Sequence, residues 1–228
     1  MLCYYQALQK CKNGDSACLT KIGNEILEKY YEGLPEYHLV PLDPLHIKKM
    51  IFERDVHGPV SIDVTLTDVD LIGFKNMKFT AIKGFQADLS GRTELIATIP
   101  ELRLKGHYKI DGQILVLPIK GEGDMEIVIS GAQSNYSFDM KPNEKKGKIH
   151  AVVEHVKFNI EPDQIKFRLD NLFNGDKTLG DNINLFLNEN WRELYAETKT
   201  NLLKPSSIVM KNIINSFLDN HPYEHFFE

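Results

Sequence analysis

The 228-residue sequence has three cysteines, one tryptophan and no apolar run long enough to span a bilayer as a helix. Basic and acidic residues are interspersed, with a formal net charge of −5, so the electrostatic footprint of a nucleic-acid-binding protein is missing. The only local basic run, residues 141–148, contains proline, asparagine and glycine and is typical of a solvated turn. We therefore expect neither a nucleic-acid partner nor stable insertion into a membrane.

Motifs of catalysis are also missing. The sequence contains no Gly-x-Ser-x-Gly elbow, and the glycine-rich segment at 121–124 precedes a strand pattern rather than the helix that a phosphate loop needs. His221 and His225 have helical spacing, but Pro222 lies between them and the other histidines are scattered. We expect no enzyme activity, no cofactor and no metal site.

The cysteines lie within the first eighteen residues. Bridging Cys11 and Cys18 would close a short loop and contribute roughly 2.5 kcal/mol in the chain-entropy model; Cys3 could stay free, pair between chains or compete for Cys11. The N-terminal residues lack a signal-peptide pattern, which fits either a cytosolic protein or a mature secreted chain. The cysteines favour secretion, and the glycosylation sequon at Asn135 adds weak support.

An amphipathic helix is predicted at about 16–32, with Leu19, Ile22 and Ile26 on one face and Pro35 beyond its end. It is either a helix docked on the core or a lid over an interior space. The proline-rich segment after it is expected to cross the molecule in an extended form.

A curved sheet is predicted at about 55–172. Apolar and polar residues alternate there, but the alternation slips in phase without a turn, as between Leu66 and Val69 and between Val153 and Val156. Such slips are typical of β-bulges, which bend strands. We expect long, strongly curved antiparallel strands with one buried face.

The period then lengthens to that of a helix. A long helix is predicted at about 181–203, roughly 35 Å long, with a break at Pro205 and a continuation at 205–219. The fold class is therefore α+β, one domain over residues 1–228, in which a highly curved antiparallel sheet wraps a long C-terminal helix.

Three segments carry a resemblance to a known family. "CKNGDSACL", "GLPEYHLVPLDPL" and "NLFNGDKTLGDNINLFLNENWRELY" resemble the takeout and juvenile-hormone-binding-protein family of insects, and the third looks closer to the takeout branch. The resemblance covers nearly the whole chain. It implies a secreted protein of the tubular lipid-binding type, an apolar ligand in an internal tunnel, and a disulfide between Cys11 and Cys18.

Two departures argue against juvenile hormone itself. Juvenile-hormone carriers have a second disulfide later in the chain, whereas no cysteine follows Cys18 here. They also place a tyrosine against the hormone on a strand that corresponds to "PIKGEGDME", where this sequence has Glu122 between two glycines. A longer or different lipid remains open.

The sequence thus predicts a secreted, monomeric carrier of a terpenoid, a fatty-acid-like molecule or another long-chain lipid, bound between sheet and long helix. The alternatives are a juvenile-hormone carrier proper and a ligand-free secreted interaction module with a filled interior. Every candidate lining residue is apolar or aromatic and is also compatible with ordinary core packing. The candidates are Leu19, Ile22, Ile26, Phe79, Phe85, Tyr108, Met125, Tyr136, Phe138, Phe158 and Phe173, with Trp191 and Tyr195 on the long helix.

Overall fold

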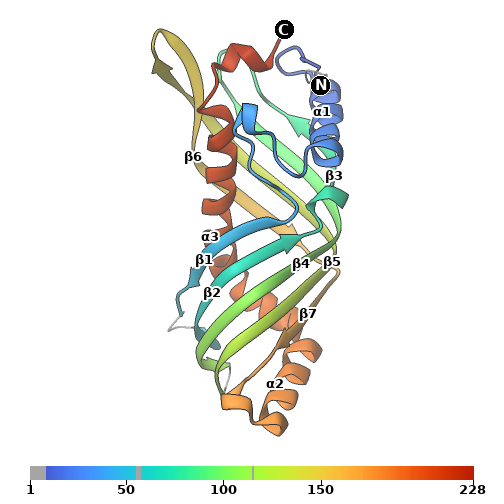
Figure 1. Ribbon diagram of the computed structural model, residues 1–228, viewed down its shortest axis with the longest axis vertical. Coiled ribbons are helices and arrows are strands. Elements are labelled where there is room, and N and C mark those ends of the chain that lie inside the picture. Colours follow the sequence, from blue (N-terminus) through green and yellow to red (C-terminus); the bar gives the residue numbers. More distant parts are fainter. Residues whose placement is uncertain (1–8, 55–57, 115) are drawn as a thin grey trace, which may run out of the picture.

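The computed structural model describes residues 9–54, 58–114 and 116–228 and shows an elongated molecule built on one curved antiparallel sheet (Figure 1). The helices are α1 (Ser16–Lys29), α2 (Lys177–Glu189) and α3 (Trp191–Leu218), with short 3-10 segments η1 (Pro35–Tyr37), η2 (Phe74–Asn76), η3 (Phe173–Gly175) and η4 (Tyr223–Phe226). The strands are β1 (Leu45–Phe52), β2 (Val60–Ile72), β3 (Lys78–Lys83), β4 (Arg92–Ile114), β5 (Leu117–Lys145), β6 (Lys148–Glu161) and β7 (Gln164–Leu169).

The sheet is organised around the long hairpin of β4 and β5. Strand β4 pairs along its length with residues 117–139 of β5, and shorter strands complete the sheet on either side. In the lower half of Figure 1, β1 and β2 extend the sheet from β4, and β7 pairs with β5. In the upper half, β3 pairs with β4 and β6 pairs with β5. The predicted long, curved antiparallel sheet is confirmed, and it is an open sheet.

The two halves meet where both long strands change phase. Ile99 and Leu102 are both buried on β4, on either side of Pro100, so the buried face switches there. On β5 the matching switch falls at Gly131, whose φ of +62° lies in the left-handed region that glycine adopts without strain. Because both strands slip together, their pairing register is kept on either side of this point.

The predicted bulges are also present. The pairing of β2 with β4 shifts between Thr67 and Asp70, and β6 carries an extra residue between Val153 and Val156. An extra residue bends a strand and increases its twist. The bulges therefore help the sheet to curve around its interior.

Two predicted boundaries were wrong. The sheet begins at Leu45, before residue 55, with the edge strand β1. The prediction missed this strand because it follows Pro44 directly and its two adjacent lysines obscure the alternation of apolar residues. The first helix ends at Lys29, where Tyr30 forms its C-cap, and not at residue 32.

The predicted break of the long helix was also wrong. The helical region is interrupted at Asn190, whose side-chain amide donates to the Phe186 carbonyl. Helix α3 then runs through Pro205 without interruption. A proline removes only one backbone hydrogen bond from a helix, and the hydroxyls of Ser206 and Ser207 donate to carbonyls one turn earlier. The predicted long C-terminal helix is confirmed as α3, and α2 precedes it as a separate helix. Helix α2 packs against β7, and α3 packs against β6.

The predicted disulfide between Cys11 and Cys18 is present and ties the N-terminal segment to the first turn of α1. Replacing both cysteines by serine is expected to destabilise the protein by about 2.5 kcal/mol and to lower Tm by roughly 5–10 °C in a thermal melt. Cys3 lies outside the described residues. Cys3→Ser alone is the control, and an equal fall of Tm in that variant would argue against this assignment.

Candidate ligand-binding cavities

The interior holds two apolar cavities. The upper cavity, of about 290 Å³, lies among α1, β3, the upper parts of β4 and β5, the end of α3 and the C-terminal residues. The lower cavity, of about 300 Å³, lies among β1, β2, β7, the lower parts of β4 and β5, and α3. Leu45, Phe74, Tyr136 and Met210 line both. The cavities therefore lie end to end, separated by these four side chains.

The four separating side chains, two of which are aromatic, form a constriction between the cavities. The Tyr136 ring stacks on Phe158 with a centroid distance of 4.7 Å and an interplanar angle of 11°. Burial raises the pKa of Tyr136 to about 12, and its hydroxyl is hydrogen-bonded to the Ser134 side chain. This phenol stays neutral at any physiological pH, so the constriction carries no charge.

The polar groups in the lower cavity wall are already bonded to protein. Tyr108 donates to the Asp170 carbonyl at 2.8 Å, and Tyr195 donates to the Ile160 carbonyl at 2.6 Å. The hydroxyls of Thr198 and Ser206 donate to carbonyls within α3. A ligand here would meet a wall without a free donor among the residues that the structure describes, which suits hydrocarbon.

The upper end of the upper cavity is more polar. Gln9, Lys10 and His225 contribute to its lining, beside aromatic residues of the C-terminal segment. The first described residues meet the last ones here. The backbones of Cys11 and Phe227 pair in an isolated β-bridge, and the Glu228 amide donates to the Cys11 carbonyl at 3.1 Å (Figure 1).

Helix α1 forms a docked wall of the upper cavity. The Thr20 hydroxyl oxygen accepts from the Ile82 amide at 2.9 Å, and the Asn24 amide bonds both the N–H and the carbonyl of Phe79, at 2.8 and 3.0 Å. These contacts hold α1 on the edge of β3, and its apolar face lines the cavity.

Eleven of the thirteen predicted residues line these cavities. The upper cavity has Leu19, Ile22, Ile26, Phe79, Phe85 and Phe138, the lower one has Tyr108, Met125, Phe158 and Tyr195, and Tyr136 lines both.

Phe173 and Trp191 lie outside the lining of both. Trp191 starts α3 directly after the break, so the helical phase that placed it inward does not carry across Asn190. Its ring lies 5.0 Å from the Arg192 guanidinium. Phe173 belongs to η3, has a positive φ and packs against the edge of the core.

Sequence reasoning missed the lining from η1 and the C-terminal end. Tyr37, Leu39 and Leu42 come from the proline-rich segment, and Phe226 and Phe227 from the last residues. The paired aromatics in "EHFF" were a usable signal, because a terminal segment has little reason to carry them unless it docks.

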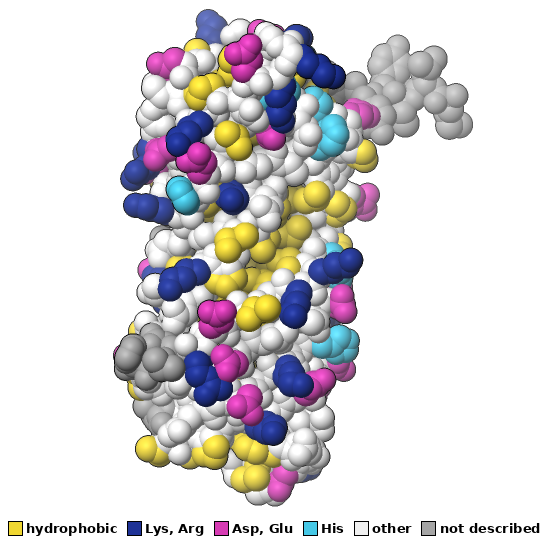
Figure 2. Space-filling model, turned by 90° about the vertical axis from the view of Figure 1, so that its left-hand side faces the viewer, with side chains coloured by type: hydrophobic (Ala, Val, Ile, Leu, Met, Phe, Trp, Pro, Cys, Tyr) yellow, Lys and Arg dark blue, Asp and Glu magenta, His cyan; other side chains and the backbone are white. Residues whose placement is uncertain are grey.

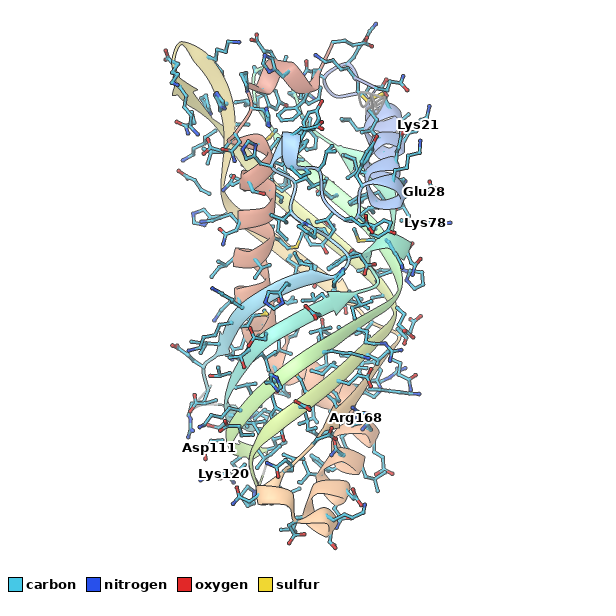
Figure 3. The ribbon with its side chains drawn as sticks, viewed as in Figure 1. Lys21, Glu28, Lys78, Asp111, Lys120 and Arg168 are labelled. Atoms are coloured by element: carbon cyan, nitrogen blue, oxygen red, sulfur yellow. A yellow bond between two sulfur atoms is a disulfide. The ribbon has the colours of Figure 1, made fainter. Side chains whose placement is uncertain are left out.

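The outer surface is charged and mixed. Figure 3 shows six labelled charged side chains pointing away from the interior: Lys21, Glu28, Lys78, Asp111, Lys120 and Arg168. On the side where α3 and β1 lie, apolar side chains gather in a hollow midway along the molecule (Figure 2). Asn135 is exposed on β5. No helix in the described ranges is long and apolar enough to cross a membrane.

Glu122 points away from the cavities. It is exposed, and its carboxylate lies 3.0 Å from the Lys109 ammonium. At the neighbouring Gly121, an added Cβ would lie 2.8 Å from the Tyr108 hydroxyl and 3.0 Å from Leu172. A side chain at position 121 would therefore meet Tyr108 and Leu172 first.

Comparisons with known proteins agree with this architecture. Residues 4–228 match the model of the family described as "Haemolymph juvenile hormone binding protein (JHBP)". The circadian clock-controlled protein daywake of Drosophila melanogaster is 27% identical over 97% of this chain and 87% of its own length. The juvenile hormone-binding protein of Manduca sexta is 26% identical over 60% of this chain and 57% of its own.

Among solved structures, Takeout 1 of Epiphyas postvittana superimposes with a TM-score of 0.78 and 27% identity, over 96% of this chain and 99% of that one. Family model and solved structure each cover nearly the whole chain. The chain therefore belongs to the haemolymph juvenile hormone binding protein family, and its fold is that of takeout.

Proposed function

We propose that this protein is a secreted carrier that encloses one elongated apolar lipid, a terpenoid, a fatty-acid-like molecule or another long-chain lipid, along the two cavities. The observation that carries the proposal is their end-to-end arrangement behind an almost wholly apolar wall. Cavities of about 300 Å³ are at the small end of ligand sites in proteins. Two in line suit a slender molecule better than a compact one.

Burial of hydrocarbon supplies enough free energy for carriage. At about 25 cal/mol per Å², enclosing about 400 Å² of ligand contributes roughly 10 kcal/mol before ordering costs. The weakly polar end of the ligand would lie at the upper end, near Gln9 and Lys10, where the lining offers hydrogen-bond donors. Binding of this kind requires no catalytic group.

Secretion is part of the proposal. The disulfide between Cys11 and Cys18 is of the kind that persists in oxidising compartments, and the family is named for haemolymph. A ligand-free interaction module is the weaker alternative, because it requires a filled interior and the two cavities leave space. The crowded backbone at Gly121 favours a lipid other than juvenile hormone.

The proposal is tested by extracting the purified protein with organic solvent and identifying what is released by mass spectrometry. We expect one long-chain or terpenoid species at close to one molecule per chain. Protein that was denatured, washed and refolded is the control and should release none. An empty extract, together with no uptake of a fluorescent long-chain fatty acid, would overturn the carrier proposal.

A further inference from the structure

The C-terminal residues close the upper cavity. His225, Phe226 and Phe227 line it directly, and the Phe226 ring packs at a tilt against Phe217 of α3 with a centroid distance of 4.6 Å. The Tyr223 hydroxyl donates to the Gln86 carbonyl at 3.1 Å. Residues 221–228, called the C-terminal cover below, therefore form part of the cavity wall.

A pair of histidines holds the start of this cover. His38, at the end of η1, places Nδ1 3.3 Å from Nε2 of His221, and the ring centroids lie 5.3 Å apart. His221 also hydrogen-bonds the Glu36 backbone and lies against Tyr37, with the ring centroids 5.5 Å apart. A hydrogen bond between two imidazoles needs one ring nitrogen to donate and the other to accept.

Protonation of both rings removes that acceptor and places two positive charges in contact. Burial lowers the pKa of His221, and the neighbouring His38 and His225 lower it further, which together outweigh the opposing effect of the hydrogen bond to the Glu36 backbone. The docked cover therefore favours the neutral ring, and the released cover favours the protonated one. As the pH falls through the usual histidine range near 6.5, the equilibrium shifts toward release.

The surrounding groups do not cancel this effect. Asp219 is already engaged, because the Lys145 ammonium lies 2.8 Å from its carboxylate and the His150 Nδ1 lies 3.0 Å from its carbonyl oxygen. The carboxylates of Glu36 and Glu224 belong to exposed residues. The titratable or charged groups that pack around His221 are thus His38, His225, His150, Glu36, Glu224, Tyr37 and the Asp219–Lys145 pair.

We propose that the C-terminal cover is an acid-opened portal of the upper cavity, held shut at neutral pH by the contact between His38 and His221. This inference rests on the proposed carrier function for its purpose. The opening itself is a property of the protein alone. The three hydrogen bonds between α1 and β3 make the cover, rather than α1, the part that moves.

Opening is measured first without ligand, by hydrogen exchange of the amides of residues 221–228 at pH 7.5 and 5.5, corrected for intrinsic exchange rates. We expect protection to fall about tenfold at pH 5.5, a conservative value for two like charges at this separation. His38→Gln with His221→Gln keeps hydrogen-bonding capacity without titrating and should remove most of the pH dependence. His46→Gln with His107→Gln replaces two exposed histidines of β1 and β4 and is the matched control.

The second measurement is the dissociation rate of a fluorescent long-chain fatty acid from the same proteins. It should rise about tenfold at pH 5.5 in the wild type and in the control, and change little in the His38/His221 variant. Equal pH dependence in all three proteins, or unchanged protection of the cover, would overturn the portal. If the probe does not bind at pH 7.5, the carrier function fails, and hydrogen exchange still decides whether the cover opens.

Discussion

Replacing Asn184 and Asn188 together by alanine is expected to lower Tm by roughly 5–15 °C. Each asparagine points from α2 to the edge of β7 and bonds both backbone groups of one residue: Asn184 bonds Leu169, and Asn188 bonds Phe167. The four distances are 2.8 to 2.9 Å. The helix thus supplies the partners that a further strand would supply.

The size of the effect follows from the four hydrogen bonds to β7 that are lost. At about 0.5–1.5 kcal/mol each they contribute roughly 2–6 kcal/mol, reduced slightly by the better helix propensity of alanine. For a chain of this length, 1 kcal/mol corresponds to roughly 2–4 °C in Tm. Asn182→Ala changes an exposed asparagine of the same helix and should leave Tm nearly unchanged. A double variant that melts like this control would show that water replaces the asparagines without cost.

The same contact occurs at two other edges. Asn24 of α1 bonds Phe79 of β3, and Asn215 of α3 bonds the N–H and carbonyl of Val153, both at 2.8 Å. An unpaired strand edge invites association with other chains. These asparagines therefore both attach the helices and cap three edges of an open sheet, which explains how that sheet encloses a cavity without closing into a barrel.

The bending of the sheet could be predicted from the sequence, because a bulge shifts the alternation of apolar and polar residues. The slip between Leu66 and Val69 and the slip between Val153 and Val156 both appear in the structure as shifts of pairing register. The position at which the helical region is interrupted could not be predicted from the sequence. The local chemistry of Pro205 suggests an interruption of the helix there. The helix is instead interrupted at Asn190, because α2 packs along β7 and α3 packs along β6. That choice depends on contacts between elements distant in sequence.

The candidate site was predicted in the same uneven way. Residues on regular elements, such as Ile22 on α1 and Phe138 on β5, were placed by periodicity alone. The C-terminal cover has no regular alternation of apolar residues. Its position depends on the backbone β-bridge between Cys11 and Phe227, which are far apart in the sequence. The asparagine contacts were equally invisible, because an asparagine in a helix usually faces solvent.

Filling either cavity from α3 should weaken lipid binding by about 50-fold. Ile213 lines only the upper cavity and Leu203 only the lower one, and both are half-buried on the same helix. A tryptophan at either position occupies space that the ligand would fill. If it displaces about 100 Å² of ligand contact, the loss is about 2.5 kcal/mol, close to 50-fold in Kd.

The pair of variants also decides how the ligand lies. One molecule that spans both cavities past Tyr136 loses affinity in Ile213→Trp and in Leu203→Trp alike, whereas a ligand confined to one cavity responds to one variant only. Titration with a fluorescent long-chain fatty acid measures each Kd. Ile208→Trp is the control, because Ile208 is 59% exposed on the same helix and should leave binding unchanged. Since each cavity alone is small for a long-chain lipid, we expect both interior variants to lose binding. Unchanged affinity in both would mean that the lipid binds outside these cavities, and the tryptophans would then report only on the packing of the core.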